Sequence, residues 1–497
     1  MRPLGRNLVL ALSYAVGTEP KPLVDALTAE VSPAGFSLRL IHLIEEVERY
    51  FVDDRPIMRL LERYAGTWEY ESGLMEIGTR ICEKRSKPDA LARMAWNLIE
   101  IELEEQDEAS ESGGTVFLVR SLKRPEEVRF LRQKCGEQFF MISMHSSHQR
   151  RMLNLKKSLG RRRDLPSGKS PAAIAEELIR RDLWEDEERP GGQHLDATFP
   201  EADYFVDVDN LNDLRAQVKR FAEMVFGYPF HTPTKAEFAM HHASSAQKRS
   251  SSGTRQVGCA VADPDGSIVV VGTNEVPKAH GGLYWEGDLP DGRDFMISPG
   301  DPLYAGRDPS YARRKDILQE LVQFMLCAQR GKRWSNASKY RSQSERLVEQ
   351  MLSERLFARR AKYGVLDVGR AVHAEMDALM TAARRGVAVR DCELYCTTFP
   401  CHNCAKHIVA AGISAVYFIW PYRSSITEQL WHDSIEVDPP ADRNSDKIAF
   451  RPFVGVAPRR YLAFFEMGQR VEHDHEDRFV SWSMSTATNR FAAPSDD

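Results

Sequence analysis

The sequence predicts an α/β protein of two domains: a parallel-sheet domain, then an α/β/α sandwich that carries a helical insertion. Three observations support this prediction. The chain has 497 residues, more than one hydrophobic core usually fills. An apolar strand over residues 7–12 leads into a glycine-containing loop, as the first strand of a parallel sheet does. Between residues 256 and 420, apolar runs of strand length alternate with segments of helical period.

We expect the first domain over residues 1–230 and the second over 234–465, joined near 229–233 and followed by a polar tail over 466–497. The patterns of the second domain predict, in chain order, hairpin strands 256–261 and 267–273, helix 372–384, strand 392–399, helix 401–411 and strand 414–420. A charged segment over about 298–370 interrupts this order, with helical patterns at 317–327 and 347–356. We expect it to pack against a neighbouring subunit or to cover the active site.

A metal-site pattern lies where two of the predicted helices begin. The triplet His373-Ala374-Glu375 is followed, after one predicted strand, by Pro400-Cys401-His402-Asn403-Cys404. A catalytic zinc ion takes three protein ligands and keeps a fourth position open, and one imidazole with two thiolates meets that need. His373, Cys401 and Cys404 are therefore the candidate ligands, and Zn²⁺ is the predicted cofactor. H-x-E followed by P-C-x-x-C is the pattern of zinc-dependent nucleobase deaminases.

Glu375 is not expected to bind the metal, so its carboxyl is available for proton transfer. It would take a proton from the attacking water and pass it to N3 of a cytosine as the oxygen adds to C4. It would then protonate the leaving amine. Glu375 is therefore the predicted catalytic residue of a deamination that leaves uracil.

The alternative for the cysteines is a closed structural zinc site, in which Cys392 and Cys396 join Cys401 and Cys404. If residues 392–399 form a strand, Cys392 and Cys396 lie roughly 13 Å apart at about 3.3 Å per residue. That separation is too large for both to bind one tetrahedral ion. The spacing favours the three-ligand catalytic site.

Segments 255–261 (RQVGCAV) and 272–278 (GTNEVPK) resemble the paired-strand region of deoxycytidylate deaminases. The resemblance implies that Asn274 contacts the nucleotide. Arg249 and Arg255, with Lys248, flank the same entrance and suit phosphate oxygens, although a solvated basic face would look the same. Tyr422 follows the last core strand, where related enzymes place residues near the bound base. It would stack on the base or serve in packing.

A closer resemblance is to the bacterial anti-phage deoxycytidylate and dCTP deaminases. It rests, in chain order, on segments 120–128 (RSLKRPEEV), 139–142 (FFMI), 203–207 (DYFVD), 226–230 (FGYPF), 276–285 (VPKAHGGLYW) and 291–295 (DGRDF). It implies a degenerate P-loop kinase-like domain fused to a deaminase that depletes deoxycytidine nucleotides during phage infection. It also implies a homo-oligomer and an inhibitory RNA partner. Asp377 departs from the Asn that ordinary deoxycytidylate deaminases carry, which leaves the choice between dCMP and dCTP open.

The segment 13–18 (SYAVGT) stands where a P-loop would end in Gly-Lys-Ser/Thr, and the phosphate-binding Lys is absent. Gly17 and Thr18 are the candidate nucleotide-binding residues of this degenerate loop. The first domain is then either a nucleotide sensor or a scaffold that binds nothing. A basic run follows at Arg150, Arg151, Lys156, Lys157, Arg161, Arg162 and Arg163, as a phosphate-facing lid or an exposed charged helix.

Composition narrows the class of protein. A net charge of -5 gives no general footprint for nucleic-acid binding. Eight cysteines in a chain of this size fit no disulfide framework, and no apolar run is long enough to span a bilayer, so we expect a cytoplasmic protein. The favoured function is deamination of free dCMP or dCTP. The alternatives are a deaminase of RNA or single-stranded DNA, a housekeeping dCMP deaminase of pyrimidine biosynthesis, and a nucleotide-sensing defence switch.

Overall fold

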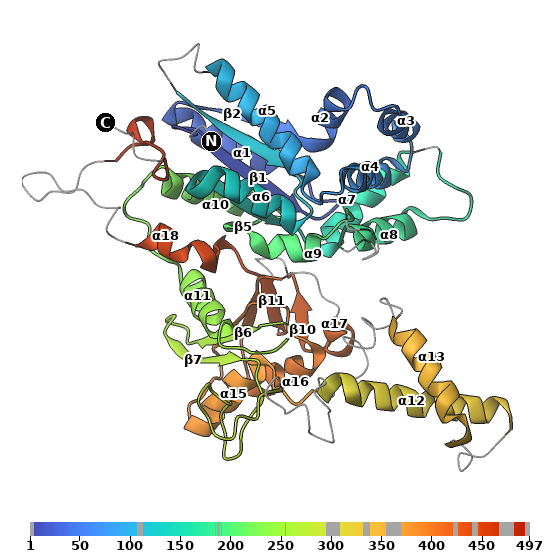
Figure 1. Cartoon of the computed structure of the whole chain (residues 1–497). Helices are drawn as coiled ribbons and strands as arrows, with labels where there is room; N and C mark the ends of the chain where they lie inside the picture. Colours follow the sequence, from blue (N-terminus) through green and yellow to red (C-terminus); the bar gives the residue numbers. More distant parts are fainter. Residues whose placement is uncertain are drawn as a thin grey trace, which may run out of the picture. The chain divides into compact units, whose positions relative to one another are not determined.

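The computed structural model describes residues 4–106, 113–162, 164–183, 185, 189, 191–253, 255–294, 309–331, 338–353, 369–420, 426–439, 446–466 and 482–492. The chain divides into two compact units (Figure 1). Unit 1 comprises Met1–Glu237 and Pro452–Asp497, and unit 2 comprises Phe238–Arg451. Each unit is built around its own six-stranded sheet, so the predicted α/β class is confirmed.

The sheet of unit 1 has the strand order β12-β5-β4-β1-β3-β2. All its pairs are parallel except β12 with β5. Its strands are β1 (Leu8–Tyr14), β2 (Phe36–His42), β3 (Gly114–Arg120), β4 (Phe139–His145), β5 (Tyr204–Asp207) and β12 (Gly455–Val456). Every residue of β1 and β4 is buried, as expected for strands covered on both faces.

Helices cover both faces of this sheet. They are α1 (Lys21–Val31), α2 (Leu43–Tyr50), α3 (Arg55–Tyr64), α4 (Tyr70–Arg85), α5 (Ala90–Gln106), α6 (Pro125–Cys135), α7 (His148–Gly160), α8 (Pro171–Leu183), α9 (Leu195–Thr198), α10 (Leu211–Val225) and α18 (Tyr461–Phe465). Alternate residues of β1 enter two different cores: Val9 packs with α2 to α6, and Leu10 packs with α1 and α10. The period of two along a strand produces this division.

The end of the chain returns to unit 1. Strand β12 pairs antiparallel with β5, and Trp482 and Phe491 pack against the core that contains Leu10. We expected residues 452–465 in the second domain and a polar tail over 466–497; the structure instead assigns Pro452–Asp497 to unit 1, and the described residues 482–492 include side chains that pack on its core. Aromatic side chains within this serine-rich stretch supply the apolar surface that holds it. The boundary between the units lies after Glu237, beyond the predicted 229–233.

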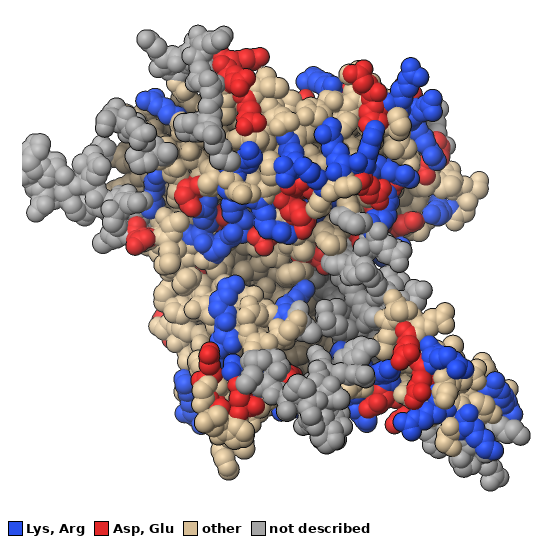
Figure 2. Space-filling view, in the orientation of Figure 1, with Lys and Arg blue, Asp and Glu red and all other residues tan. Residues whose placement is uncertain are grey.

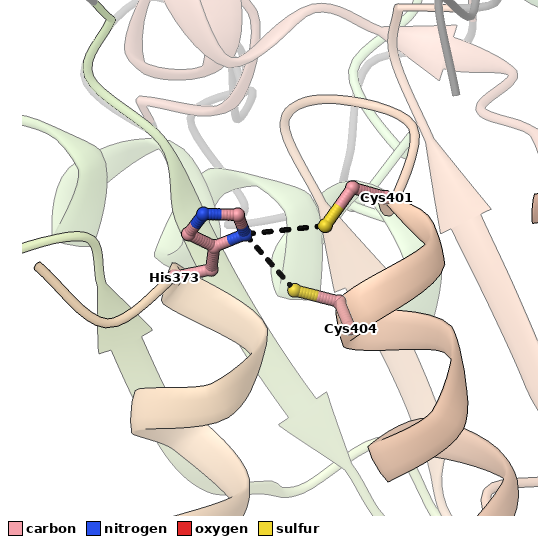
Figure 3. A group of neighbouring side chains, drawn as sticks. All are labelled: His373, Cys401 and Cys404. Atoms are coloured by element: carbon pink, nitrogen blue, oxygen red, sulfur yellow. Dashed lines mark hydrogen bonds between the residues drawn. The ribbon is translucent and has the colours of Figure 1, made fainter. Parts of the chain in front are cut away.

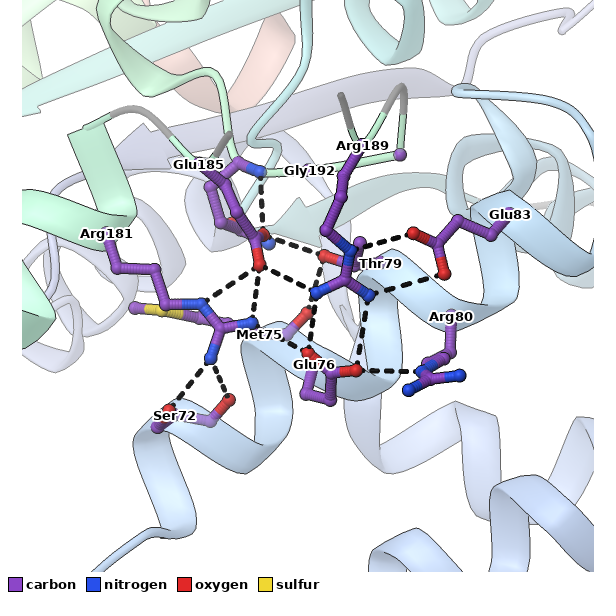
Figure 4. A network of polar contacts seen from close by, with 12 residues as sticks. Ser72, Met75, Glu76, Thr79, Arg80, Glu83, Arg181, Glu185, Arg189 and Gly192 are labelled. Atoms are coloured by element: carbon purple, nitrogen blue, oxygen red, sulfur yellow. Dashed lines mark hydrogen bonds and ion pairs between the residues drawn. The ribbon is translucent and has the colours of Figure 1, made fainter. Parts of the chain in front are cut away.

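A network of ion pairs joins α4 to the segment that follows α8 (Figure 4). Glu76 accepts from both Arg181 and Arg189 at 2.9 Å, and Glu185 accepts from the same two arginines at 2.6 and 3.2 Å. Hydrogen bonds from Arg189, together with Arg80 and Arg181, lower the pKa of Glu76 to about 2. The network therefore fastens Glu185 and Arg189 to α4.

The sheet of unit 2 has the order β10-β11-β9-β8-β6-β7 and mixes parallel with antiparallel pairs. Its strands are β6 (Gly258–Ala262), β7 (Ile268–Thr273), β8 (Glu393–Cys396), β9 (Ala415–Phe418), β10 (Ile435–Val437) and β11 (Ile448–Pro452). The helices are α11 (Lys235–Gln247), α12 (Pro309–Gln329), α13 (Arg341–Ser353), α15 (Ala374–Arg385), α16 (His402–Ala411) and α17 (Thr427–Leu430). The predicted hairpin, helices and strands are confirmed, although β8 and β9 are shorter than expected.

The predicted insertion contains α12 and α13, which pack on each other through Leu318, Val322 and Val348. We also expected this insertion to cover the active site or to pack against a neighbouring subunit, and that expectation stays a prediction. Among the described residues, no helix combines the length and the apolar character needed to cross a membrane.

Candidate metal centre

The three predicted metal ligands converge at the starts of two helices in unit 2 (Figure 3). His373 is the N-cap of α15 and Cys401 is the N-cap of α16, with Cys404 in the first turn of that helix. His373 Nδ1 lies 3.3 Å from each sulfur atom. In the part of the chain that the structure describes, this is the group of His, Cys, Asp and Glu side chains that could hold a metal ion.

The donor atoms fit a tetrahedral zinc ion. All lie within 4.8 Å of one another. Zn–S bonds of about 2.3 Å and Zn–N bonds of about 2.0 Å at a tetrahedral angle place sulfur and nitrogen about 3.5 Å apart. The observed 3.3 Å separations are close to that value. Three soft or borderline donors with one position left open are the donor set of a catalytic zinc site.

The two thiols are poised for metal binding. Hydrogen bonds from Cys404 and His373 lower the pKa of Cys401 to about 4, so its sulfur is a thiolate at neutral pH. Burial raises the pKa of Cys404, which is fully shielded from solvent. The Cys404 thiol then holds the proton that a bound dication would displace.

Glu375 lies two residues after His373 in the first turn of α15, and 3 % of it is exposed. Burial raises the pKa of its carboxyl, and the negative charge of Cys401 raises it further. A carboxyl with a raised pKa can both accept and donate a proton near neutrality. The predicted proton-transfer residue therefore lies beside the predicted ligands.

Close packing of α15 on β7 sets the position of His373 and Glu375. At Gly272 of β7, a Cβ atom would lie 2.2 Å from the carbonyl oxygen of Ala374 and 2.5 Å from the amide nitrogen of Ala378. Only glycine lets the helix backbone approach the strand this closely.

Asp377 ties the first turn of α15 to the end of β7, because its carboxylate accepts from Thr273 N–H at 3.1 Å. Burial raises the pKa of Asp377, and the positive charge of Arg249 opposes that shift. On the other side of the site, Thr427 donates to the carbonyl of Pro400 and Trp431 donates to the carbonyl of His402. These contacts hold the turn that presents Cys401.

Asn274 has a role in the scaffold that the sequence did not reveal. Its Oδ1 accepts from Val257 N–H at 2.7 Å, and its Nδ2 donates to the carbonyl of Arg255 at 2.8 Å. The amide thus holds the chain that leads into β6. A contact between Asn274 and a nucleotide stays a prediction.

The two predicted phosphate-binding arginines each lie over a tryptophan. The Arg249 guanidinium is 3.5 Å from the ring centroid of Trp285, and that of Arg255 is 4.0 Å from the centroid of Trp420. Burial lowers the pKa of Arg249. The sequence did not predict these two stacking contacts, because each tryptophan is separated from its arginine by many residues. Tyr422 lies outside the described residues.

Gly17 and Thr18 belong to unit 1, whereas the metal ligands belong to unit 2. In their loop, Val16 N–H donates to the Asp182 carboxylate at 2.7 Å, and Lys123 pairs with the same carboxylate at 2.7 Å. The Asp182 carboxylate therefore already accepts the hydrogen bond of one backbone N–H group of the degenerate loop, that of Val16.

Cys392 and Cys396 do not join the metal group among the described residues. Cys396 of β8 lies opposite Cys259 of β6 in the sheet; both are free cysteines, and both side chains are fully buried. The three-ligand arrangement is favoured over the four-thiolate cage.

Comparison with known proteins agrees with this geometry. Residues 233–420 match the family model described as the cytidine and deoxycytidylate deaminase zinc-binding region. ComE operon protein 2 of Bacillus subtilis (strain 168) is 33% identical over 90 residues, which are 16% of this chain and 48% of that protein. The deoxycytidylate deaminase of Homo sapiens is 32% identical over 101 residues, 20% of this chain and 50% of that protein.

The chain thus spans about half the length of the curated relatives it matches. Among solved structures, the dCMP deaminase of cyanophage S-TIM5 is 16% identical, covering 44% of this chain and 99% of that one. Its TM-score of 0.22 is too low to support a conclusion about the fold. The sequence match alone identifies a deaminase-type zinc-binding region within residues 233–420.

Proposed function

We propose that this protein is a zinc-dependent hydrolase that deaminates deoxycytidine nucleotides. With water, dCMP or dCTP would give dUMP or dUTP and ammonia. The observation that carries the proposal is the convergence of His373, Cys401 and Cys404 beside the buried carboxyl of Glu375. The match of residues 233–420 to the deaminase zinc-binding region supports it independently.

Zinc, when bound, supplies Lewis acidity that makes water nucleophilic near neutral pH. Glu375 transfers the protons between water and the base during the reaction. Its carboxylate takes a proton from the attacking water and delivers it to N3 of the base while C4 becomes tetrahedral. The carboxylate then takes the second proton, that of the new C4 hydroxyl group, and delivers it to the amino group at C4, so that ammonia leaves as the C4 carbonyl forms. Burial of Glu375 supports this role because its raised pKa matches both donor and acceptor duties.

Two features support a free nucleotide as the substrate. Arg249 and Arg255 offer guanidinium groups for phosphate, and stacking on Trp285 and Trp420 limits their movement. The human relative is named a deoxycytidylate deaminase. The choice between dCMP and dCTP depends on how many phosphate oxygens the guanidinium groups of Arg249 and Arg255 contact.

The test is base conversion by the zinc-loaded full chain, followed by chromatography. The substrates are dCMP, dCTP, CMP, CTP, deoxycytidine and a cytosine-containing DNA strand, with Glu375→Gln as the control. Conversion of dCMP or dCTP that the control lacks is the expected result. Conversion of the DNA strand alone would contradict the proposal and favour a polymer deaminase.

The resemblance to anti-phage deaminases motivates a biological role. We infer that the enzyme lowers the dCTP pool of an infected cell, acts in the cytoplasm, and is restrained by an RNA partner before infection. Unit 1 would be the degenerate kinase-like partner domain. A homo-oligomer is consistent with α12, where Leu321 and Met325 are 53% and 52% exposed. Phage plaque counts on cells carrying the wild type or Glu375→Gln test the role, and equal counts would contradict it.

A further inference from the structure

Unit 1 contains a pocket of about 660 Å³ among helices α2 to α6. This volume lies in the range of sites that hold a nucleotide-sized ligand. None of its lining residues belongs to the metal centre or to the loop of Gly17. The pocket is therefore a separate feature that deamination does not explain.

The lining is rich in positive charge. Five Lys or Arg side chains and two acidic side chains face the pocket. Lys84 is paired with Asp54, and Arg93 is paired with Asp89. In contrast, Arg85, Lys87 and Lys134 line the pocket without a carboxylate partner among the described residues. Figure 2 shows how frequent Lys and Arg side chains are on the visible face of this unit.

Aromatic rings hold several of these cations in place. The Arg85 guanidinium lies 5.1 Å from the ring centroid of Phe51, and the Lys134 ammonium lies 5.7 Å from that of Trp96. A guanidinium stacked on a ring keeps its edge N–H groups free for phosphate oxygens. Tyr50 is 36% exposed, and Asn97 holds its hydroxyl by a hydrogen bond of 2.8 Å, so its ring offers a surface on which a base can stack.

Trp96 supplies a second, independent sign of a ligand. Its side chain lines the pocket and is 3% exposed, yet its indole Nε1 has no hydrogen-bond acceptor among the described residues. A buried N–H group without an acceptor is costly, and native proteins usually satisfy such groups with protein, water or ligand. Nε1 is itself shielded from solvent, so an acceptor atom of a bound molecule would satisfy this donor once the indole turns its N–H edge toward the pocket.

We propose that this pocket binds a nucleotide. The phosphate groups of the nucleotide contact Arg85, Lys87 and Lys134, and the base or sugar of the nucleotide accepts a hydrogen bond from Trp96. The proposal concerns unit 1 alone and does not depend on the deaminase activity. A nucleotide site in this unit would let the protein respond to the nucleotide supply.

The experiment is isothermal titration of the zinc-loaded full chain with dATP, which carries no cytosine, and with pyrophosphate. The first variant is Arg85→Gln with Lys87→Gln, both exposed at the end of α4. Its matched control is Arg215→Gln with Lys219→Gln, an exposed pair on α10 that lines no part of the pocket. We expect dATP to bind the wild type and the control equally, and the pocket variant about 10-fold or more weakly.

Trp96→Phe is the second variant, since it keeps an aromatic ring but removes the N–H donor. Weaker dATP binding with unchanged pyrophosphate binding is expected from it. Equal dATP affinity in the pocket variant and its control would overturn the proposal, as would absence of dATP binding to the wild type. Pyrophosphate binding as tight as that of dATP would overturn the nucleotide assignment.

Discussion

Replacement of Asn274 by alanine tests whether this residue serves the scaffold or the substrate. The change removes two neutral hydrogen bonds, from Val257 N–H at 2.7 Å and to the Arg255 carbonyl at 2.8 Å. Each such bond contributes about 0.5–1.5 kcal/mol net, so Asn274→Ala should lower the free energy of unfolding of unit 2 by about 1–3 kcal/mol. Misplacement of residues 255–257 should also lower kcat/KM.

The assay combines urea unfolding with steady-state kinetics on dCMP and dCTP. The unfolding transition of unit 2 is recognised by its shift when zinc is removed. Asn274→Asp is the matched variant, since it keeps the acceptor for Val257 N–H and replaces the donor with a carboxylate oxygen that the Arg255 carbonyl repels. It should therefore also lower the free energy of unfolding of unit 2. Unchanged stability in both variants with a tenfold higher KM would refute the scaffold role and make Asn274 a substrate contact.

Four further predictions follow from the contacts of other residues. Cys404→Ser should lower the zinc content measured by metal analysis and abolish deamination, and a chelator should do the same to the wild type. Gly272→Ala should push α15 from β7, since its Cβ would meet helix backbone at 2.2 Å, and reduce kcat by about 100-fold without loss of the fold seen by circular dichroism. Glu127→Ala should leave the buried guanidinium of Arg124 unpaired and cost about 3–5 kcal/mol in urea unfolding. The pKa of Glu76 is lowered from 4.5 to about 2. The ionised Glu76 carboxylate therefore stabilises unit 1 fully above about pH 5, and this stabilisation is lost as the pH falls toward 2. Acid unfolding of Glu76→Gln beside the wild type would show this loss.

The sequence predicts the grouping of His373, Cys401 and Cys404 because the information for this grouping is local. H-x-E and P-C-x-x-C each lie at a helix start, and a helix start displays its N-cap and first turn on one side. The two helices, α15 and α16, pack on the same sheet, so their first turns can meet where both helices begin at the same edge of that sheet. The apolar run between the two motifs and the one after the second motif have strand length, which predicts β8 and β9. The residues of the centre therefore follow from short motifs and the order of elements.

Contacts between distant segments were not predictable in this way. Nothing near Asn274 in the sequence shows that its amide holds residues 255 and 257, because that depends on how β6 and β7 pair. The return of β12 to β5 joins positions about 250 residues apart, and its two-residue length gives no periodic signal. Such features need the assembled fold.

The loop after β1 shows how tertiary contacts change the function that a motif implies. Val16 N–H, which a working P-loop would turn toward phosphate, donates to the buried carboxylate of Asp182. Lys123 pairs with that carboxylate, so its charge is also engaged. A phosphate entering here would meet the like charge of Asp182 and would have to displace it from both partners. In the pocket among α2 to α6, a phosphate could meet Arg85, Lys87 and Lys134 without displacing a carboxylate bound to them, so a nucleotide that binds unit 1 should bind in the pocket rather than in the degenerate loop.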